Sequence, residues 1–165
     1  LDKTNGYCIQ KPPKNEAWDF KTEEKKLQGS LVSVAHRIDD IAVEVWFQKQ
    51  DKVNPLDLSP KETAKGELKG IEEMKTKGDY KEVKVKELPK EVKFPGDGKP
   101  AAHYFRAIIK DRNDRELEWI EWIFISKANQ GQYRVWVIGA PGEYDKKKKE
   151  IELILASFRS FKLPK

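Results

Sequence analysis

The chain is poor in the residues that build disulfide frameworks and histidine-based metal sites. It contains one cysteine, Cys8, and two histidines among 165 residues. A lone cysteine excludes an internal disulfide framework, and two histidines give little support to a metal site built from histidines. No apolar run approaches the roughly 18 residues that a spanning helix needs, so we expect no integral membrane segment in this chain. Catalytic and cofactor-binding motifs are also missing, so we expect no enzyme activity, no metal and no cofactor.

Apolar and charged residues are nearly balanced in the chain. Hydrophobic residues account for 38% of it and charged residues for 37%, with a formal net charge of +5. Such a composition is too apolar for disorder, and a chain of 165 residues can bury a core without disulfides. We therefore expect a single domain over residues 1–165. The first residue is Leu1 rather than methionine, which indicates a processed form or a piece of a longer protein whose targeting segment is absent.

Strand patterns dominate the N-terminal part. Residues 31–38 and 41–50 are rich in β-branched and aromatic residues, and the Asp39-Asp40 step between them suits a hairpin turn. From Ile41 to Phe47 apolar residues alternate with more polar ones, which is typical of a strand with one apolar face. Short strands are also expected at residues 6–10 and 18–20.

Helical patterns occur twice. Ser59, Pro60 and Glu62 match a capping box with proline at the first helical position, and they predict a helix over residues 60–77. A second helix is expected to begin after Pro141. Its apolar stripe has helical spacing and consists of Tyr144, Ile151, Ile154, Leu155 and Phe158.

The segments between the helices favour further strands. Residues 80–88 alternate valines with charged residues, which is typical of an exposed or edge strand, and residues 89–100 hold prolines and glycines that predict a loop. Residues 117–128 are apolar on both strand faces, so this strand must be central and covered on both sides. The pattern predicts an α+β fold: an α/β/α sandwich around a mostly antiparallel sheet of six to seven strands.

The ordered pattern resembles the PsbP family and its relatives, the Mog-type Ran-binding proteins and the DcrB-type bacterial domains. The resemblance rests on Gly6-Tyr7-x-Ile9-x-x-Pro12 running into Trp18, on the helix starting at Ser59, and on the closing Ile154-Leu155-Ala156-Ser157-Phe158. It implies a non-enzymatic role in binding other proteins and an extracytoplasmic location: secreted, periplasmic or lumenal. No motif for photosystem components or a Ran-type GTPase occurs, so those partners are not transferred.

The histidines, the cysteine and the lysine run each have a structural explanation that we favour. His36 and His103 both fall on predicted strands, and a joint catalytic site would require those strands to be neighbours. Cys8 in a strand is typical of a small buried apolar residue. The run from Lys146 to Lys149 is followed at once by acids, which favours a solvated helix face over a nucleic-acid interface.

The five tryptophans suggest where a binding site could lie. Trp46 and Trp122 share their strand faces with polar residues and could line a groove, but we favour the explanation that the closing helix simply covers them. The candidate binding residues are Trp46, Tyr104, Arg106 and Trp122. We expect recognition of a protein partner through a sheet-edge groove and the loop at 89–100. The alternative is a carrier of a small apolar or lipidic ligand held between sheet and helix, which a pocket of several hundred cubic ångströms lined by tryptophans would favour.

Overall fold

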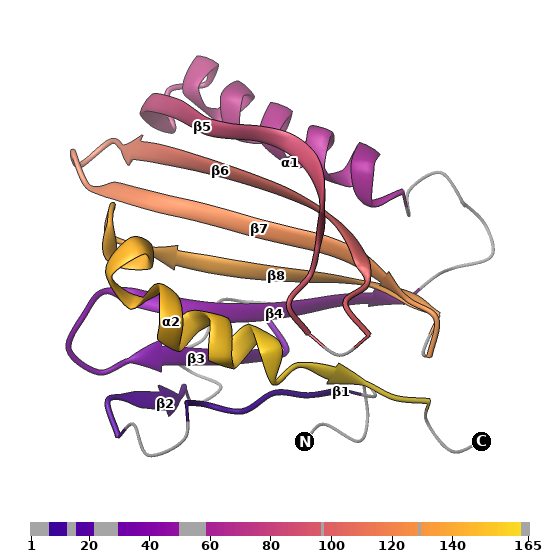
Figure 1. Cartoon of the computed structure of the whole chain (residues 1–165). Helices are drawn as coiled ribbons and strands as arrows, with labels where there is room; N and C mark the ends of the chain where they lie inside the picture. The colour runs from indigo at the N-terminus through magenta and orange to yellow at the C-terminus, as the bar shows by residue number, and fades with distance from the viewer. Residues whose placement is uncertain are drawn as a thin grey trace.

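The computed structural model describes residues 7–12, 16–21, 30–49, 59–96, 98–128 and 130–162. Two helices and nine strands alternate along these residues (Figure 1). In chain order they are β1 (Tyr7–Cys8), β2 (Trp18–Phe20), β3 (Val32–His36), β4 (Ile41–Lys49), α1 (Pro60–Thr76), β5 (Tyr80–Lys93), β6 (Ala101–Asp111), β7 (Glu116–Ser126), β8 (Gly131–Gly139), α2 (Glu143–Ala156) and β9 (Arg159–Ser160).

The main sheet has seven strands in the order β2-β3-β4-β8-β7-β6-β5, and every neighbouring pair is antiparallel. It consists of two meanders, β2–β4 and β5–β8, which are joined where β4 pairs with β8. A separate two-stranded ribbon pairs β1 with β9 and so brings the two ends of the described chain together. The predicted α+β fold with a mostly antiparallel sheet is confirmed.

β7 explains why the sheet needs cover on both sides. Ile120, Trp122 and Phe124 point into one buried cluster, whereas Trp119 and Ile123 point into another on the opposite face. Burial of one large apolar side chain stabilises a fold by about 1.5–3 kcal/mol, so neither set can stay in water without a large loss of stability. The prediction that this strand is central and covered on both faces is confirmed.

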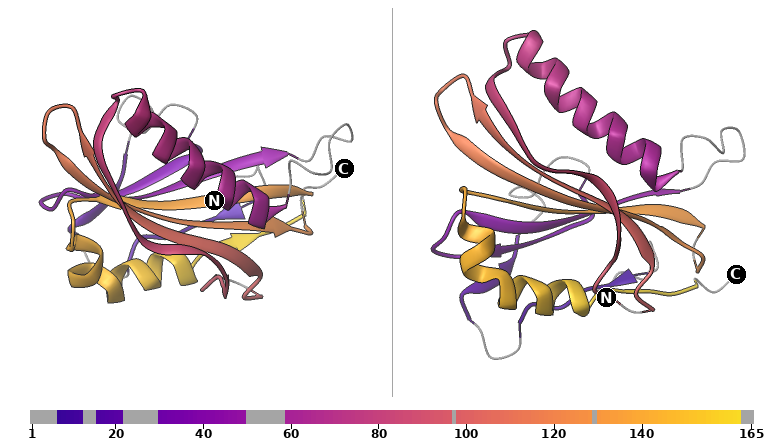
Figure 2. Two further views of the ribbon diagram at one scale, coloured as in Figure 1. Left: turned by 90° about the horizontal axis from the view of Figure 1, so that it is seen from above. Right: turned by 45° about the horizontal axis from the view of Figure 1, so that its top comes forward.

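The two helices lie on opposite faces of the sheet and over opposite halves of it (Figure 2). α1 packs against β5, β6 and β7 through Ala64, Leu68 and Ile71. α2 packs against β4 and β8 through the apolar stripe that includes Ile151 and Ile154. Among the described residues, no helix covers β5 and β6 on the α2 face (Figure 1). This diagonal arrangement positions the candidate site.

Two local predictions were wrong. The first is the loop from Pro89, because β5 continues through this proline to Lys93. An edge strand tolerates proline where no partner needs its N–H, and register shifts on both sides of Glu87 absorb the irregularity. The second is the capping box, because Ser59 occupies the N-cap without a side-chain hydrogen bond.

Candidate functional site

A groove opens between the edge strand β5 and helix α2, on the part of the sheet that α2 leaves uncovered. Its floor is formed by Tyr104 of β6 and Trp122 of β7, which are directly paired in register and have ring centroids 5.2 Å apart. Tyr144 of α2 closes one side, with its ring 6.4 Å from that of Trp122. The volume of this open groove is about 260 Å³. We call this feature the β5–α2 groove.

The rim of the β5–α2 groove carries charges of both signs. The Tyr104 hydroxyl donates a hydrogen bond to Glu87 Oε1 at 2.8 Å, and Lys90 pairs with the same carboxylate. The Lys90 ammonium also lies 5.5 Å from the centroid of the Tyr104 ring. The bond from Lys90 lowers the pKa of Glu87, and burial together with Glu87 raises the pKa of Tyr104 well above its usual value. Lys148 and Glu152 of α2 supply the facing charges.

Arg106 lies beside the groove but is committed to contacts within the chain. Its Nε donates to Glu118 Oε1 at 2.7 Å, and its Nη2 donates to Asp145 Oδ2 at 2.7 Å. The guanidinium also lies 5.4 Å from the centroid of the Tyr144 ring. The hydrogen bonds that Arg106 donates to Asp145 and to Glu118 raise its pKa. Because Glu118 also accepts from the Gly142 N–H at 3.2 Å, Arg106 and Glu118 together fasten the N-terminus of α2 to the sheet.

Trp46 lies on the opposite face of the sheet from the other three candidate residues. Its ring centroid is 4.6 Å from that of Trp136, which in turn lies 4.6 Å from that of Trp119. The structure therefore brings Tyr104, Arg106 and Trp122 together and separates them from Trp46. Trp122, which is 5% exposed, lies beside Tyr144 of α2 at the floor of the groove, whereas Trp46 lies on the face that α2 does not cover. No local sequence pattern indicated that Tyr144 and Glu87 belong to the same groove.

No protein-family model and no curated protein matches this sequence. Among solved structures, the chain is similar to the solution structure of cyanobacterial PsbP (CyanoP) from Synechocystis. The TM-score is 0.66 at 13% sequence identity, and the alignment covers 97% of this chain and 89% of that one. The fold is PsbP-like. A crystal structure from Bacteroides thetaiotaomicron is similar with a TM-score of 0.53 and 13% identity, and the alignment covers 96% of this chain but only 49% of that one.

Within the PsbP-like fold the two histidines are far apart. β4, β8 and β7 lie between β3, which carries His36, and β6, which carries His103, a separation of about 19 Å at the usual strand spacing. His36 packs edge-on against Trp18 and lies 3.0 Å from the Asp39 carboxylate. Because β3 and β6 are not neighbours, His36 and His103 do not form the joint catalytic site considered from the sequence. Cys8 is half-buried in β1.

Three further expectations from the sequence concern metals, membrane segments and the lysine run. The described residues contain no group of His, Cys, Asp or Glu side chains arranged to hold a metal ion. Neither described helix combines the length and hydrophobicity needed to cross a bilayer. In the lysine run, Lys146 pairs with Glu143, Lys147 with Asp39 and Lys148 with Glu152. These lysines therefore lie on a face of mixed charge.

Proposed function

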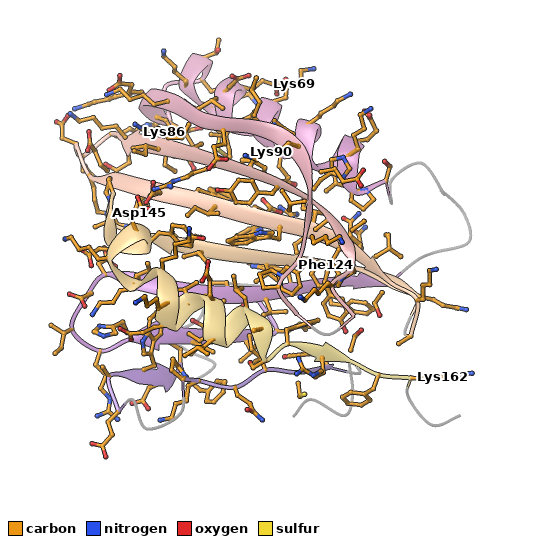
Figure 3. All side chains as sticks on the ribbon, in the orientation of Figure 1. Lys69, Lys86, Lys90, Phe124, Asp145 and Lys162 are labelled. Atoms are coloured by element: carbon orange, nitrogen blue, oxygen red, sulfur yellow. The ribbon has the colours of Figure 1, made fainter. Side chains whose placement is uncertain are left out.

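We propose that this chain is a non-enzymatic, extracytoplasmic binding domain that recognises a protein partner through the β5–α2 groove. The observation that supports this most is the uncovered part of the sheet face beside α2, where aromatic rings form the floor and paired charges form the rim. Protein interfaces are enriched in tyrosine and tryptophan at their centre and carry a polar rim. Figure 3 labels Lys90 on β5 and Asp145 on α2, the two elements that flank this part of the sheet.

The size and charge of the groove favour a protein over a small molecule. Its volume of about 260 Å³ falls below the roughly 300–1,000 Å³ of typical small-ligand pockets. It suits one side chain inserted from a larger surface, and Leu88 on the adjoining edge is 71% exposed as a further apolar contact. Lysines, glutamates and bulges along β5 oppose the addition of another strand. We therefore expect side-chain recognition rather than pairing of backbones.

Site-specific photo-crosslinking in cells that naturally make the protein tests this proposal. A photoreactive phenylalanine analogue replaces Lys148, an exposed residue lining the groove, and in a matched chain it replaces Lys69 on the exposed side of α1. We expect a discrete protein adduct from position 148 and none from position 69. Adducts of equal yield from both positions, or none from either, would contradict the proposal.

Charge reversal supplies the matched control for that experiment. Lys90 and Lys69 are both exposed lysines that pair with a glutamate on their own element, Glu87 and Glu73 respectively. Lys90→Glu is expected to lower the adduct yield from position 148 several-fold, whereas Lys69→Glu is expected to leave it unchanged. If both reversals act equally, the effect is one of net charge and the groove is not the recognition surface.

A second candidate function, carriage of a small apolar ligand, is supported by a different hollow. It has a volume of about 620 Å³, within the usual range for small ligands. Phe94, Phe124 and Phe158 line it, rather than the tryptophans that we expected. Native mass spectrometry of the purified chain with dodecanoic acid tests this function: a one-to-one complex that Ala101→Trp abolishes would support it, and no complex would refute it.

A further inference from the structure

Two buried carboxylates on the sheet each form an ion pair with an arginine on a neighbouring strand. Glu118 of β7 is 3% exposed and Glu121 of the same strand is fully buried. Arg106 of β6 lies 2.7 Å from Glu118, and Arg134 of β8 lies 2.7 Å from Glu121. This is the expected arrangement, because a buried charge is costly unless an opposite charge and hydrogen bonds compensate it.

Glu44 of β4 is a third buried carboxylate, and it has no such partner. Its side chain is 1% exposed. The hydroxyl of Ser30 donates a hydrogen bond to its Oε2 at 2.6 Å. Across the described ranges no lysine, arginine or histidine lies within ion-pair distance of it. Among the described residues, Glu44 is therefore a buried carboxylate without a cationic partner, unlike Glu118 and Glu121.

Glu44 lines a hollow of about 450 Å³ at the end of the sheet next to the β3–β4 turn. On this face the paired residues Ala35 of β3 and Ala42 of β4 present small side chains, and Ile138 and the backbone of Gly139 on β8 line the same end of the hollow. Glycine is required at 139, because a Cβ there would lie 2.4 Å from the Asp40 carbonyl oxygen. Along β4, Glu44 lies farther from the turn than Ala42, so its carboxylate marks the inner end. The hollow is on the opposite sheet face from the β5–α2 groove.

The mouth of the hollow carries cations. Lys21 and Arg115 line it, and neither forms an ion pair with another residue in the described part of the chain. Arg37, a third cation at the mouth, is already paired with Asp19. Two further acids line the hollow: Asp39, which is paired with Lys147, and the exposed Asp40. A negative charge inside and two available positive charges at the entrance are complementary to a molecule that carries both signs.

We propose that this hollow binds a small zwitterion with a primary ammonium group at one end and a carboxylate at the other. The ammonium donates to the Glu44 carboxylate at the inner end, and Lys21 and Arg115 receive the ligand carboxylate at the mouth. Hydrogen bonds between charged groups are stronger than neutral ones, and Glu44 gains the counter-ion that Glu118 and Glu121 already have. This site does not depend on the groove or on the function proposed for it.

Nuclear magnetic resonance titration with 6-aminohexanoate tests the proposal on the whole chain. The readout is the shift of the methyl signals of Ala35 and Ala42. We expect saturable shifts with 6-aminohexanoate, binding several-fold weaker with hexylamine, and none with hexanoate or with added potassium chloride alone. The amide Nα-acetyl-lysine-N-methylamide presents the same ammonium as a protein lysine would. If that probe binds as tightly as 6-aminohexanoate, the proposal of a zwitterionic ligand is wrong and the site instead recognises a lysine side chain.

Two variants test separately the charge of Glu44 and the free volume of the hollow. Glu44→Gln keeps the shape and removes the charge, and we expect it to weaken 6-aminohexanoate binding at least tenfold. Ala35→Leu keeps the charge and fills the hollow, and we expect it to abolish binding. Asp40→Asn, at the exposed mouth, serves as the control with less than a threefold effect. Unchanged binding in Glu44→Gln, equal binding of hexanoate, or no shift with any amine would each refute the proposal.

Discussion

Replacement of Arg106 by methionine tests whether this residue fastens α2 to the sheet or is free to bind a partner. Methionine keeps much of the apolar length of the side chain but leaves Glu118, which is 3% exposed, without a cation. Loss of one partner of a buried ion pair costs about 3–5 kcal/mol. Because Arg106 itself is 17% exposed and Glu118 keeps the bond from the Gly142 N–H, we expect about 2–3 kcal/mol here.

Urea unfolding followed by far-ultraviolet circular dichroism measures this loss. With a denaturant slope of about 2 kcal/mol per molar, the midpoint is expected to fall by about 1–1.5 M. Asp145→Asn is the control, because the Asp145 side chain is 60% exposed and such exposed pairs contribute at most about 1 kcal/mol.

The double variant Arg106→Met with Glu118→Gln completes the cycle. Replacing the carboxylate that Arg106→Met leaves unpaired is expected to restore about 1 kcal/mol or more of the free energy of unfolding, because residues in contact show coupling of this size in such cycles. If Arg106→Met costs no more than Asp145→Asn, or if Glu118→Gln recovers nothing, then Arg106 does not fasten α2 and is available to a ligand.

Three further predictions concern backbone, ionisation and core. Gly66→Ala and Gly70→Ala are each expected to raise the free energy of unfolding by up to about 1 kcal/mol, because nothing lies within 4 Å of either new Cβ. Gly139→Ala is expected to lower it, because its Cβ would lie 2.4 Å from the Asp40 carbonyl oxygen. Thermal unfolding distinguishes these outcomes. Burial raises the pKa of Tyr144 to about 12, above the value near 10 of an unfolded tyrosine. The neutral Tyr144 therefore stabilises the fold fully below about pH 10, and this contribution is lost as the pH rises to about 12. Over this range the urea midpoint of Tyr144→Phe should fall less steeply than that of the unsubstituted protein. Trp18→Phe is expected to cost about 2 kcal/mol, because Trp18 is fully buried and its indole N–H donates to Glu150 at 2.5 Å; an equal cost in Phe20→Leu, at a position 47% exposed, would contradict this reasoning.

Local pattern was enough to predict most of the elements. The alternation from Ile41 to Phe47 and the doubly apolar segment at 117–128 report directly on burial, so they revealed a hairpin strand and a central strand. The course of β5 through Pro89 was not predictable in this way. It depends on which side of that strand faces the sheet, and the pairing with β6 decides this.

The candidate site shows which features the local sequence pattern could not predict. Tyr104 and Trp122 could be grouped because both lie on faces of mixed polarity, and the structure pairs them directly. Trp46 has the same local signature, but the pairing of β4 with β8 places it on the other face. Likewise, nothing local distinguishes Glu44 from Glu118, since the arginine that neutralises a glutamate comes from another strand.

The placement of the two helices on opposite faces is the claim on which the groove and the hollow both depend, and nuclear Overhauser contacts between side chains measure it most directly. We expect the methyl groups of Leu68 and Ile71 in α1 to show contacts with Phe105 and Ile123, and those of Ile151 and Ile154 in α2 to show contacts with Val135 and Tyr133. Contacts from methyl groups of both helices to the same one of these two sets of sheet residues would contradict the account.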